Sequence, residues 1–149
     1  MIFIDESGMD DNAYYPYAYS QKGKRYYASY PGHRKKRISM IGGLKENTFH
    51  APLMFEGHCD TKLFETYLEK VLLPILEPGM MIVLDNASFH KSAKIKALVS
   101  DAGCHLKYLP PYSPDLNPIE HWWYKIKNAI KKMMRNQKYC LRDAMELTL

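Results

Sequence analysis

The first quarter of the chain alternates between short apolar stretches and turn-forming residues, a pattern typical of strands. Residues 1–4 form an apolar, β-prone run that Ser7 and Gly8 are expected to end. Further strands are expected within residues 14–20 and over residues 37–44, because glycine- and proline-containing turn signals separate these stretches. Three consecutive strands predict an antiparallel meander at the start of the fold.

Helical periodicity begins further along the chain. Residues 60–76 carry apolar side chains at intervals of three and four, which predicts an amphipathic helix capped by Asp60 or Thr61. Residues 80–84 are uniformly apolar and are bounded by turn-forming residues on both sides. Such a run predicts a central strand that is covered on both of its faces.

The remaining elements follow from similar signals. Residues 91–102 are typical of a helix that ends at Gly103, and residues 104–109 alternate enough to predict another strand. A last long helix is expected to begin at Pro118, and its apolar stripe includes both tryptophans, at least one of which we expect in the core. Residues 141–149 are compatible with one more helix.

The element order β-β-β-α-β-α-β-α predicts an α/β fold with a mixed five-stranded sheet and helices on both faces. The 149 residues are most simply a single domain over residues 1–149, without repeats or long linkers. No apolar run approaches the ~20 residues that span a bilayer, so we expect no membrane partner. Three cysteines without paired spacing, and no secretory leader, favour a cytoplasmic protein.

Charge adds a candidate partner to this picture. The net charge is +5, and the basic residues are concentrated in residues 23–37 and 125–138, where aromatic or apolar residues separate them. Clustered positive charge favours nucleic acid as a partner, although a solvated basic face would have the same composition. The candidate contacts to DNA phosphates are Lys24, Arg25, Arg34, Lys35, Lys36, Lys127 and Lys131.

Three acidic residues occupy positions where ligands often bind. Asp5 and Asp85 each follow a predicted strand, at the carboxyl end where open α/β sheets form their binding crevices. Glu120 lies in the first turn of the last helix. Each also has an ordinary explanation: Asp5 as a turn initiator, Asp85 as part of an Asx turn, and Glu120 as the partner of Asn117 in a capping box.

The segment that precedes Glu120 favours a functional role for this residue. Residues 109–123, "LPPYSPDLNPIEHWW", contain four prolines in fifteen positions, a stiffer approach than a helix start requires. If the three acids met in one cleft, their combined negative charge would be costly without cations. Carboxylate ligands favour Mg²⁺ or Mn²⁺, and two such ions about 3.5–4 Å apart suit phosphoryl transfer.

Several strings in the chain match a known pattern. The segments "DESG", "VLDNASFHKS" and "LPPYSPDLNPIEHWWYKIK" resemble the catalytic domain of DDE transposases of the Tc1/mariner and IS630 superfamily, and the resemblance covers residues 2–135. Asp85 and Glu120 stand 35 positions apart with 34 residues between them, which is the spacing associated with that superfamily. The resemblance implies an RNase H-like fold, in which Asp5, Asp85 and Glu120 are the catalytic carboxylates and hold two Mg²⁺ or Mn²⁺ ions.

The resemblance also implies a reaction and a partner. In such enzymes metal-activated water cleaves a phosphodiester at the transposon end, and the freed 3′-hydroxyl attacks target DNA, commonly at a TA-containing site. Pairing of two transposon ends leads us to expect a homodimer on DNA, in the prokaryotic cytosol at the nucleoid. Asn86 and His90 match the family string and are candidates to support the ligands or contact phosphate, but His90 also suits a helix-start or surface position.

One feature of the sequence leaves other interpretations open. Family transposases usually carry N-terminal helix-turn-helix modules, and this sequence has no room for them, as in an excised domain, a truncated copy or the second half of a frameshifted reading frame. A non-catalytic DNA-binding remnant and an RNase H-like nuclease without strand transfer are therefore alternatives. Strand alternation turns Glu6 away from Asp5, so Glu6 is not expected to be a ligand unless the strand has already ended there.

Overall fold

The computed structural model describes residues 1–10, 21–25, 37–111, 113–135 and 139–149. Within these ranges five strands form one mixed sheet, which confirms the predicted sheet type, and their order across it is β3-β2-β1-β4-β5. The strands β1, β2 and β3 pair in antiparallel fashion, whereas β1, β4 and β5 run parallel. Their bounds are Ile2–Asp10 for β1, Arg37–Lys45 for β2, Thr48–Glu56 for β3, Met81–Leu84 for β4 and His105–Tyr108 for β5.

The helices also follow the predicted order. The first is capped by Asp60, whose carboxylate accepts a hydrogen bond from the Leu63 amide at 2.8 Å. It starts as α1 and continues as a π-helical turn and a 3-10 turn. The bounds are Thr61–Tyr67 for α1, Leu68–Leu72 for η1, Leu73–Ile75 for η2, Ser88–Lys91 for η3, Ala93–Asp101 for α2, Pro114–Leu116 for η4, Ile119–Arg135 for α3 and Leu141–Glu146 for α4.

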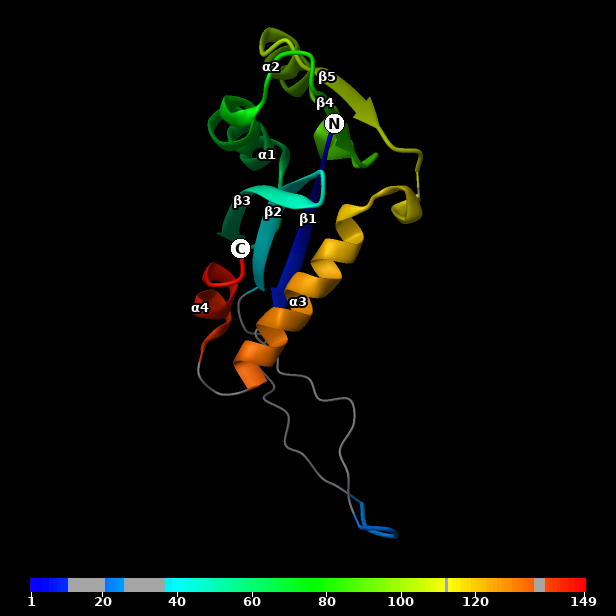
Figure 1. Cartoon of the computed structure of the whole chain (residues 1–149), viewed down its shortest axis with the longest axis vertical. Coiled ribbons are helices and arrows are strands. Elements are labelled where there is room, and N and C mark those ends of the chain that lie inside the picture. Colours follow the sequence, from blue (N-terminus) through cyan, green and yellow to red (C-terminus); the bar gives the residue numbers. More distant parts are fainter. Residues whose placement is uncertain (11–20, 26–36, 112, 136–138) are drawn as a thin grey trace.

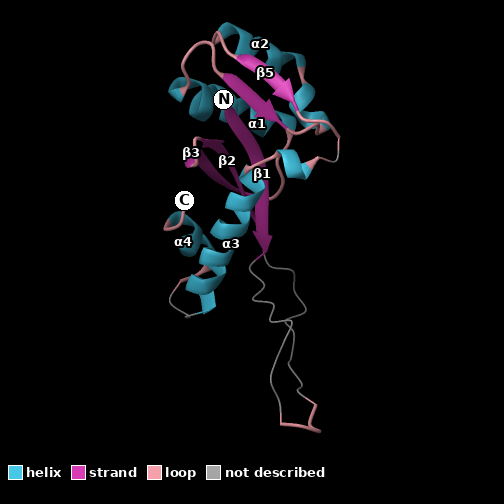
Figure 2. Ribbon diagram, turned by 45° about the vertical axis from the view of Figure 1, so that its right-hand side comes forward, coloured by secondary structure: helices cyan, strands magenta, loops and turns pink. Residues whose placement is uncertain are grey.

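Apolar side chains cover both faces of the sheet. The first cluster joins β1, β4 and the helices α1 and α2 and includes Ile4, Phe64, Tyr67, Ile82 and Ile95. The second joins β1 and β2 to α3 and α4 and includes Met9, Met40, Trp123, Ile130 and Met145. Figures 1 and 2 show α3 running alongside β1, while α1 and α2 gather near the end of the sheet that contains β4 and β5. The prediction of helices on both faces is therefore confirmed.

Two strand predictions need correction. The first strand does not end at Ser7 and Gly8 but continues to Asp10, because β2 pairs with it as far as Asp10 and Arg37. Gly8 fits within the strand because the Arg37 guanidinium occupies the space that a side chain would need.

The strand β3, Thr48–Glu56, is absent from the sequence prediction. It forms a hairpin with β2 through the two-residue turn Glu46–Asn47, in which both residues have positive φ. The strand expected within residues 14–20 lies outside the described residues.

The long β1 and the short β4 together place two acids side by side. Phe3 pairs with Val83 in the parallel ladder, and two residues further along each chain come Asp5 and Asp85. The strand β4 ends at Leu84, whereas β1 continues because it retains β2 as a partner. Asp5 is thus an interior residue of β1, not a strand-end residue as predicted, yet it lies level with the end of β4.

Candidate active site

A cleft of about 420 Å³ opens beside the end of β4. Its walls come from β1, the loop after β4, the proline-rich segment and the start of α3. The lining residues are Asp5, Asp85, Asn86, Ala87, Leu109, Pro110, Pro111, Ser113, Pro114, Asn117 and Glu120. The three acids that the sequence singled out, although distant along the chain, therefore line the same cavity.

Asp5 is the most enclosed of the three acids, with 8% of its surface exposed. Trp123, which anchors α3 in the core, donates a hydrogen bond from Nε1 to Asp5 Oδ2 at 3.0 Å. Burial, followed by the negative charges of Glu6 and Glu120, raises the pKa of Asp5 to about 7. Asp5 is thus a buried carboxyl group whose surroundings disfavour its charge, as expected where a cation is to be bound.

Asp85 is half-buried and is held by two donors at a single oxygen. Its Oδ1 accepts a hydrogen bond from the Ala87 amide at 3.0 Å and another from His90 Nδ1 at 2.6 Å. The hydrogen bond from His90 lowers the pKa of Asp85, although partial burial opposes this effect. Asp85 is therefore ionised over the whole neutral range.

His90 is completely buried, so the alternative of a surface histidine is wrong. Its Nε2 lies 2.8 Å from Glu6 Oε1, on the side of the ring opposite Asp85. Burial acts to lower the pKa of His90, but the hydrogen bonds to Asp85 and Glu6 outweigh it and raise the pKa to about 9. Glu6 is absent from the cleft wall, in agreement with the strand alternation that turns it away from Asp5.

Glu120 is exposed at the cleft, and the capping-box alternative is wrong. The Asn117 amide, which a capping glutamate would accept from, donates instead to the Pro114 carbonyl at 2.9 Å. Asn117 is buried, and among the described residues its Oδ1 finds no hydrogen-bond partner. The carboxylate of Glu120 is therefore not engaged in starting the helix.

The proline-rich segment runs from β5 to α3 along the cleft. The Leu109 amide donates to the Leu84 carbonyl at 2.8 Å, which fixes the start of the segment beside the last residue of β4. Pro110, Pro111 and Pro114 then line the cavity. Because each proline has a fixed φ angle, this stretch has few conformations available between its anchor and Glu120.

The donor set suits a hard divalent cation. Carboxylate oxygens are the ligands that Mg²⁺ and Mn²⁺ prefer, and three carboxylates line the cleft. Within the described part of the chain, no three acidic, histidine or cysteine side chains yet stand close enough together to enclose an ion. Of the three carboxylates, Glu120 is the most exposed.

The basic residues predicted to contact phosphate fall into three groups. Lys127 and Lys131 project from α3, and Lys127 is close enough to Glu120 and Asp5 to respond to their charges, although burial lowers its pKa. Lys24 and Arg25 are exposed, and Figure 1 shows the described segment 21–25, in blue, apart from the sheet. Arg34, Lys35 and Lys36 lie outside the described residues.

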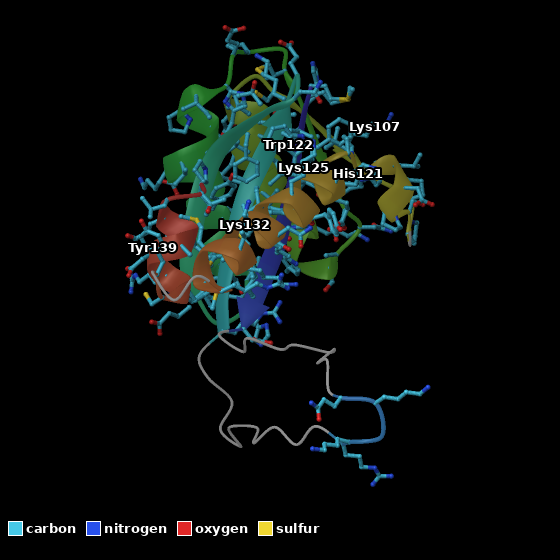
Figure 3. The ribbon with its side chains drawn as sticks, turned by 60° about the horizontal axis from the view of Figure 1, so that its bottom comes forward. Lys107, His121, Trp122, Lys125, Lys132 and Tyr139 are labelled. Carbon is cyan, nitrogen blue, oxygen red and sulfur yellow. The ribbon has the colours of Figure 1, made fainter. Side chains whose placement is uncertain are left out.

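The exposed face of α3 carries further positive charge. Figure 3 shows Lys125 and Lys132 along this helix, with Trp122 close to Lys125. The Lys125 ammonium lies 5.2 Å from the Trp122 ring centroid, so Trp122 supports a surface cation while Trp123 occupies the core.

None of the helices in the described ranges is long and apolar enough to cross a membrane.

Sequence reasoning missed the contacts that support the acids. At least one of the two tryptophans was expected in the core, and Trp123 is the buried one, but its hydrogen bond to Asp5 was not foreseen. Glu6 was set aside, although it contacts the histidine that holds Asp85. The available signal was the alternation in β1, which places Asp5 and Glu6 on opposite faces of the same central strand.

Comparison with known proteins identifies the family of this chain. A family model described as "DDE superfamily endonuclease" matches residues 1–140. The Tcb1 transposase of Caenorhabditis briggsae is 28% identical over 113 residues, which cover 70% of this chain and 41% of the relative. The Tc1 transposase of Caenorhabditis elegans is 32% identical over 68 residues, which cover 46% of this chain and 25% of the relative.

Solved structures share the fold. The chain matches the Mos1 strand transfer complex with a TM-score of 0.72 and 14% identity, over 99% of this chain and 50% of that one. It matches the Mos1 mariner paired end complex with Mn with a TM-score of 0.67 and 13% identity, over 99% of this chain and 51% of that one. These matches show an RNase H-like fold in a chain that spans about half the length of these relatives or less.

Proposed function

This chain belongs to the DDE superfamily of endonucleases, in its Tc1/mariner branch, and we propose that it cleaves DNA at transposon ends and transfers the cut strands to target DNA. The observation that carries the proposal is the shared cleft of Asp5, Asp85 and Glu120. Solved relatives described as a strand transfer complex and as a paired-end complex with a transposon end support it. Membership of the IS630 group is part of the same proposal.

Asp5, Asp85 and Glu120 are the residues that would hold two Mg²⁺ or Mn²⁺ ions. Such ions activate an attacking oxygen and neutralise the charge that develops on the phosphate during in-line displacement. The protein holds Asp5 through Trp123 and Asp85 through His90 and the Ala87 amide, so two of its three acids are oriented in advance. No side chain is required to attack the phosphate.

The partner in this proposal is DNA, bound by its backbone along the basic face of α3. Lys127 is close enough to Glu120 and Asp5 to interact with their charges, and Lys131 follows it one helical turn later in α3. Both would neutralise phosphates near the scissile bond. A homodimer would bring two transposon ends together, with a TA-containing target and a location in the prokaryotic cytosol at the nucleoid. The proposed contacts of Lys127 and Lys131 to phosphates would position the DNA without reading its sequence.

The direct test is metal-dependent nicking of supercoiled plasmid DNA by the 149-residue chain. We expect nicking in Mn²⁺, none in EDTA, and a loss of about 10²–10³-fold in rate for Asp85→Asn, a magnitude typical of removing one transition-state contact. Labelled donor ends added to the reaction would be joined to the plasmid if strand transfer occurs. Cleavage without joined products would favour the nuclease alternative, and DNA binding without cleavage would favour the regulatory remnant.

Lys127 and Lys131 make a separate prediction about DNA affinity. Replacing both with Ala is expected to weaken binding to any duplex about tenfold near 0.1 M salt and to reduce the slope of log K against log salt by about two. Fluorescence anisotropy over a range of salt concentrations measures both quantities. Lys62→Ala, an exposed site on α1, is the control, and an unchanged slope for the double variant would exclude these lysines from the DNA interface.

A further inference from the structure

A buried connection joins the first two acids on the face of the sheet away from the cleft. Asp5 and Glu6 are neighbours in β1, and alternation directs Asp5 towards α3 and Glu6 towards the opposite face. Glu6 Oε1 lies 2.8 Å from His90 Nε2, and His90 Nδ1 lies 2.6 Å from Asp85 Oδ1. The histidine ring therefore links the strand that carries Asp5 to the carboxylate of Asp85.

The histidine has little freedom to move. Its side chain is fully buried, and the rings of Phe64 and Phe89 stand with their centroids 4.2 Å from its own. The Tyr108 hydroxyl donates to the His90 carbonyl at 2.8 Å, which holds the backbone of η3 against β5. Because the ring has little room to rotate, its hydrogen bond to Glu6 fixes its orientation, and that orientation in turn fixes the hydrogen bond to Asp85.

Both nitrogens of this ring are in use, and each is needed. His90 Nδ1 and the Ala87 amide both bind Asp85 Oδ1, so Oδ2 is the oxygen left for a ligand in the cleft. Without Glu6, Nε2 would be enclosed among aromatic rings and would lack its acceptor, which favours rotation of the ring away from its present position. The orientation of Asp85 thus depends on a carboxylate that does not line the cleft itself.

We propose that Glu6 and His90 are positioning residues, which hold Oδ1 of Asp85 so that its Oδ2 faces the cation of the active site. The inference rests on the proposed function, because it assumes that Asp85 binds a divalent cation. It assigns a role to Glu6, which the pattern of three acids leaves unused. The role is an indirect one, comparable to the outer partner that orients a metal ligand.

The experiment compares three variants of the 149-residue chain for binding of Mn²⁺ alone, by electron paramagnetic resonance of the free ion. Glu6→Leu removes the acceptor and is expected to raise the Mn²⁺ Kd about tenfold, whereas Glu6→Gln keeps an acceptor oxygen and is expected to stay within about threefold of wild type. Glu65→Leu is the matched control. Its carboxylate is similarly enclosed and binds Ser92 and Lys94, but it has no contact with His90 or Asp85.

Thermal unfolding in EDTA, measured in parallel, separates positioning from stability. Glu6→Leu and Glu65→Leu are both expected to unfold at lower temperature, but only Glu6→Leu is expected to lose Mn²⁺ affinity. Its nicking rate is expected to recover at saturating Mn²⁺, because the defect lies in presenting a ligand and not in the chemistry. If Glu6→Leu does not fold, Glu6→Asp replaces it, since a side chain shorter by one methylene does not reach Nε2 and is expected to weaken Mn²⁺ binding in the same way.

The outcomes are distinct. If Glu6→Leu binds Mn²⁺ as tightly as wild type while unfolding as Glu65→Leu does, Glu6 is a structural residue and the inference is wrong. If Glu6→Gln loses as much affinity as Glu6→Leu, the charge of Glu6 matters and not its hydrogen bond, which also overturns the positioning role. If the wild-type chain binds no Mn²⁺, it is the proposed function that fails.

Discussion

Replacing Glu120 with Gln is expected to abolish metal-dependent DNA cleavage while leaving the fold intact. Gln has nearly the same shape but no charge, and a neutral amide is a much weaker partner for Mg²⁺ or Mn²⁺ than a carboxylate. The start of α3 does not depend on the Glu120 side chain, because the Asn117 amide is bound by the Pro114 carbonyl. We expect the rate of plasmid nicking to fall about 10²–10³-fold.

Stability measurements accompany this comparison. The free energy of unfolding of Glu120→Gln in EDTA is expected to change by no more than about 0.5 kcal/mol, as for other exposed positions. Glu77→Gln, at another exposed glutamate, serves as the control and should keep full activity. Retained nicking by Glu120→Gln would show that this carboxylate is not a ligand, and loss of the folded state would show that its role is structural.

Replacing Asp5 with Asn is expected to have two opposite effects: loss of cleavage and a gain in stability of the metal-free protein. The pKa of Asp5 is raised to about 7 in the folded state, mainly by burial, against 3.8 for an ordinary aspartate. As the pH rises from about 4 to 7, the unfolded chain loses this proton before the folded chain does, so the folded state becomes less stable. Above pH 7 this decrease in stability is complete. Asn does not ionise, so the variant does not undergo it.

The size of the gain is measurable. At pH 8 in EDTA we expect the free energy of unfolding of Asp5→Asn to exceed that of wild type by about 1–3 kcal/mol. At pH 4 this difference should largely disappear. Asn can still accept the hydrogen bond from Trp123 Nε1. Urea denaturation at the two pH values tests this, with Asp10→Asn at the exposed end of the same strand as the control.

An opposite result would also be informative. If Asp5→Asn were less stable than wild type at pH 8, the ionised carboxylate would be stabilising without a metal ion, and the argument that its burial calls for a cation would be wrong. The accompanying loss of cleavage is expected to reach about 10²–10³-fold, because Asn, like Gln, is a weak ligand. In the expected result, Asp5→Asn is more stable but inactive, so stability and activity favour different residues at this position, as is common at functional sites.

The sequence predicted the sheet where local signals were strong. Residues 80–84 are apolar without interruption, so the end of β4 and the position of Asp85 were clear. The end of β1 was misplaced because Gly8 normally interrupts strands, whereas here it makes room for the Arg37 side chain. The strand β3 was missed because its turn, Glu46–Asn47, lacks the glycine that usually marks such hairpins.

The candidate site was predictable in its acids but not in their supports. Asp5, Asp85 and Glu120 stand in recognisable strings, so their identity required no knowledge of distances. The contact between Glu6 and His90 joins residues 84 positions apart, and the one between Trp123 and Asp5 joins residues 118 apart. Pairings of this kind depend on the final packing of the sheet against η3 and α3, which no local pattern specifies.

The hydrogen bond of Trp123 has a consequence for how this domain tolerates change during evolution. The indole is at once the largest fully buried side chain of the fold and a donor to Asp5. At neighbouring positions of the apolar stripe, such as Ile126 or Ile130, an apolar substitution of similar volume is expected to be tolerated. The side chain at position 123 must both fill the core and donate a hydrogen bond to Asp5. A substitution there would therefore change the candidate active site as well as the packing of α3.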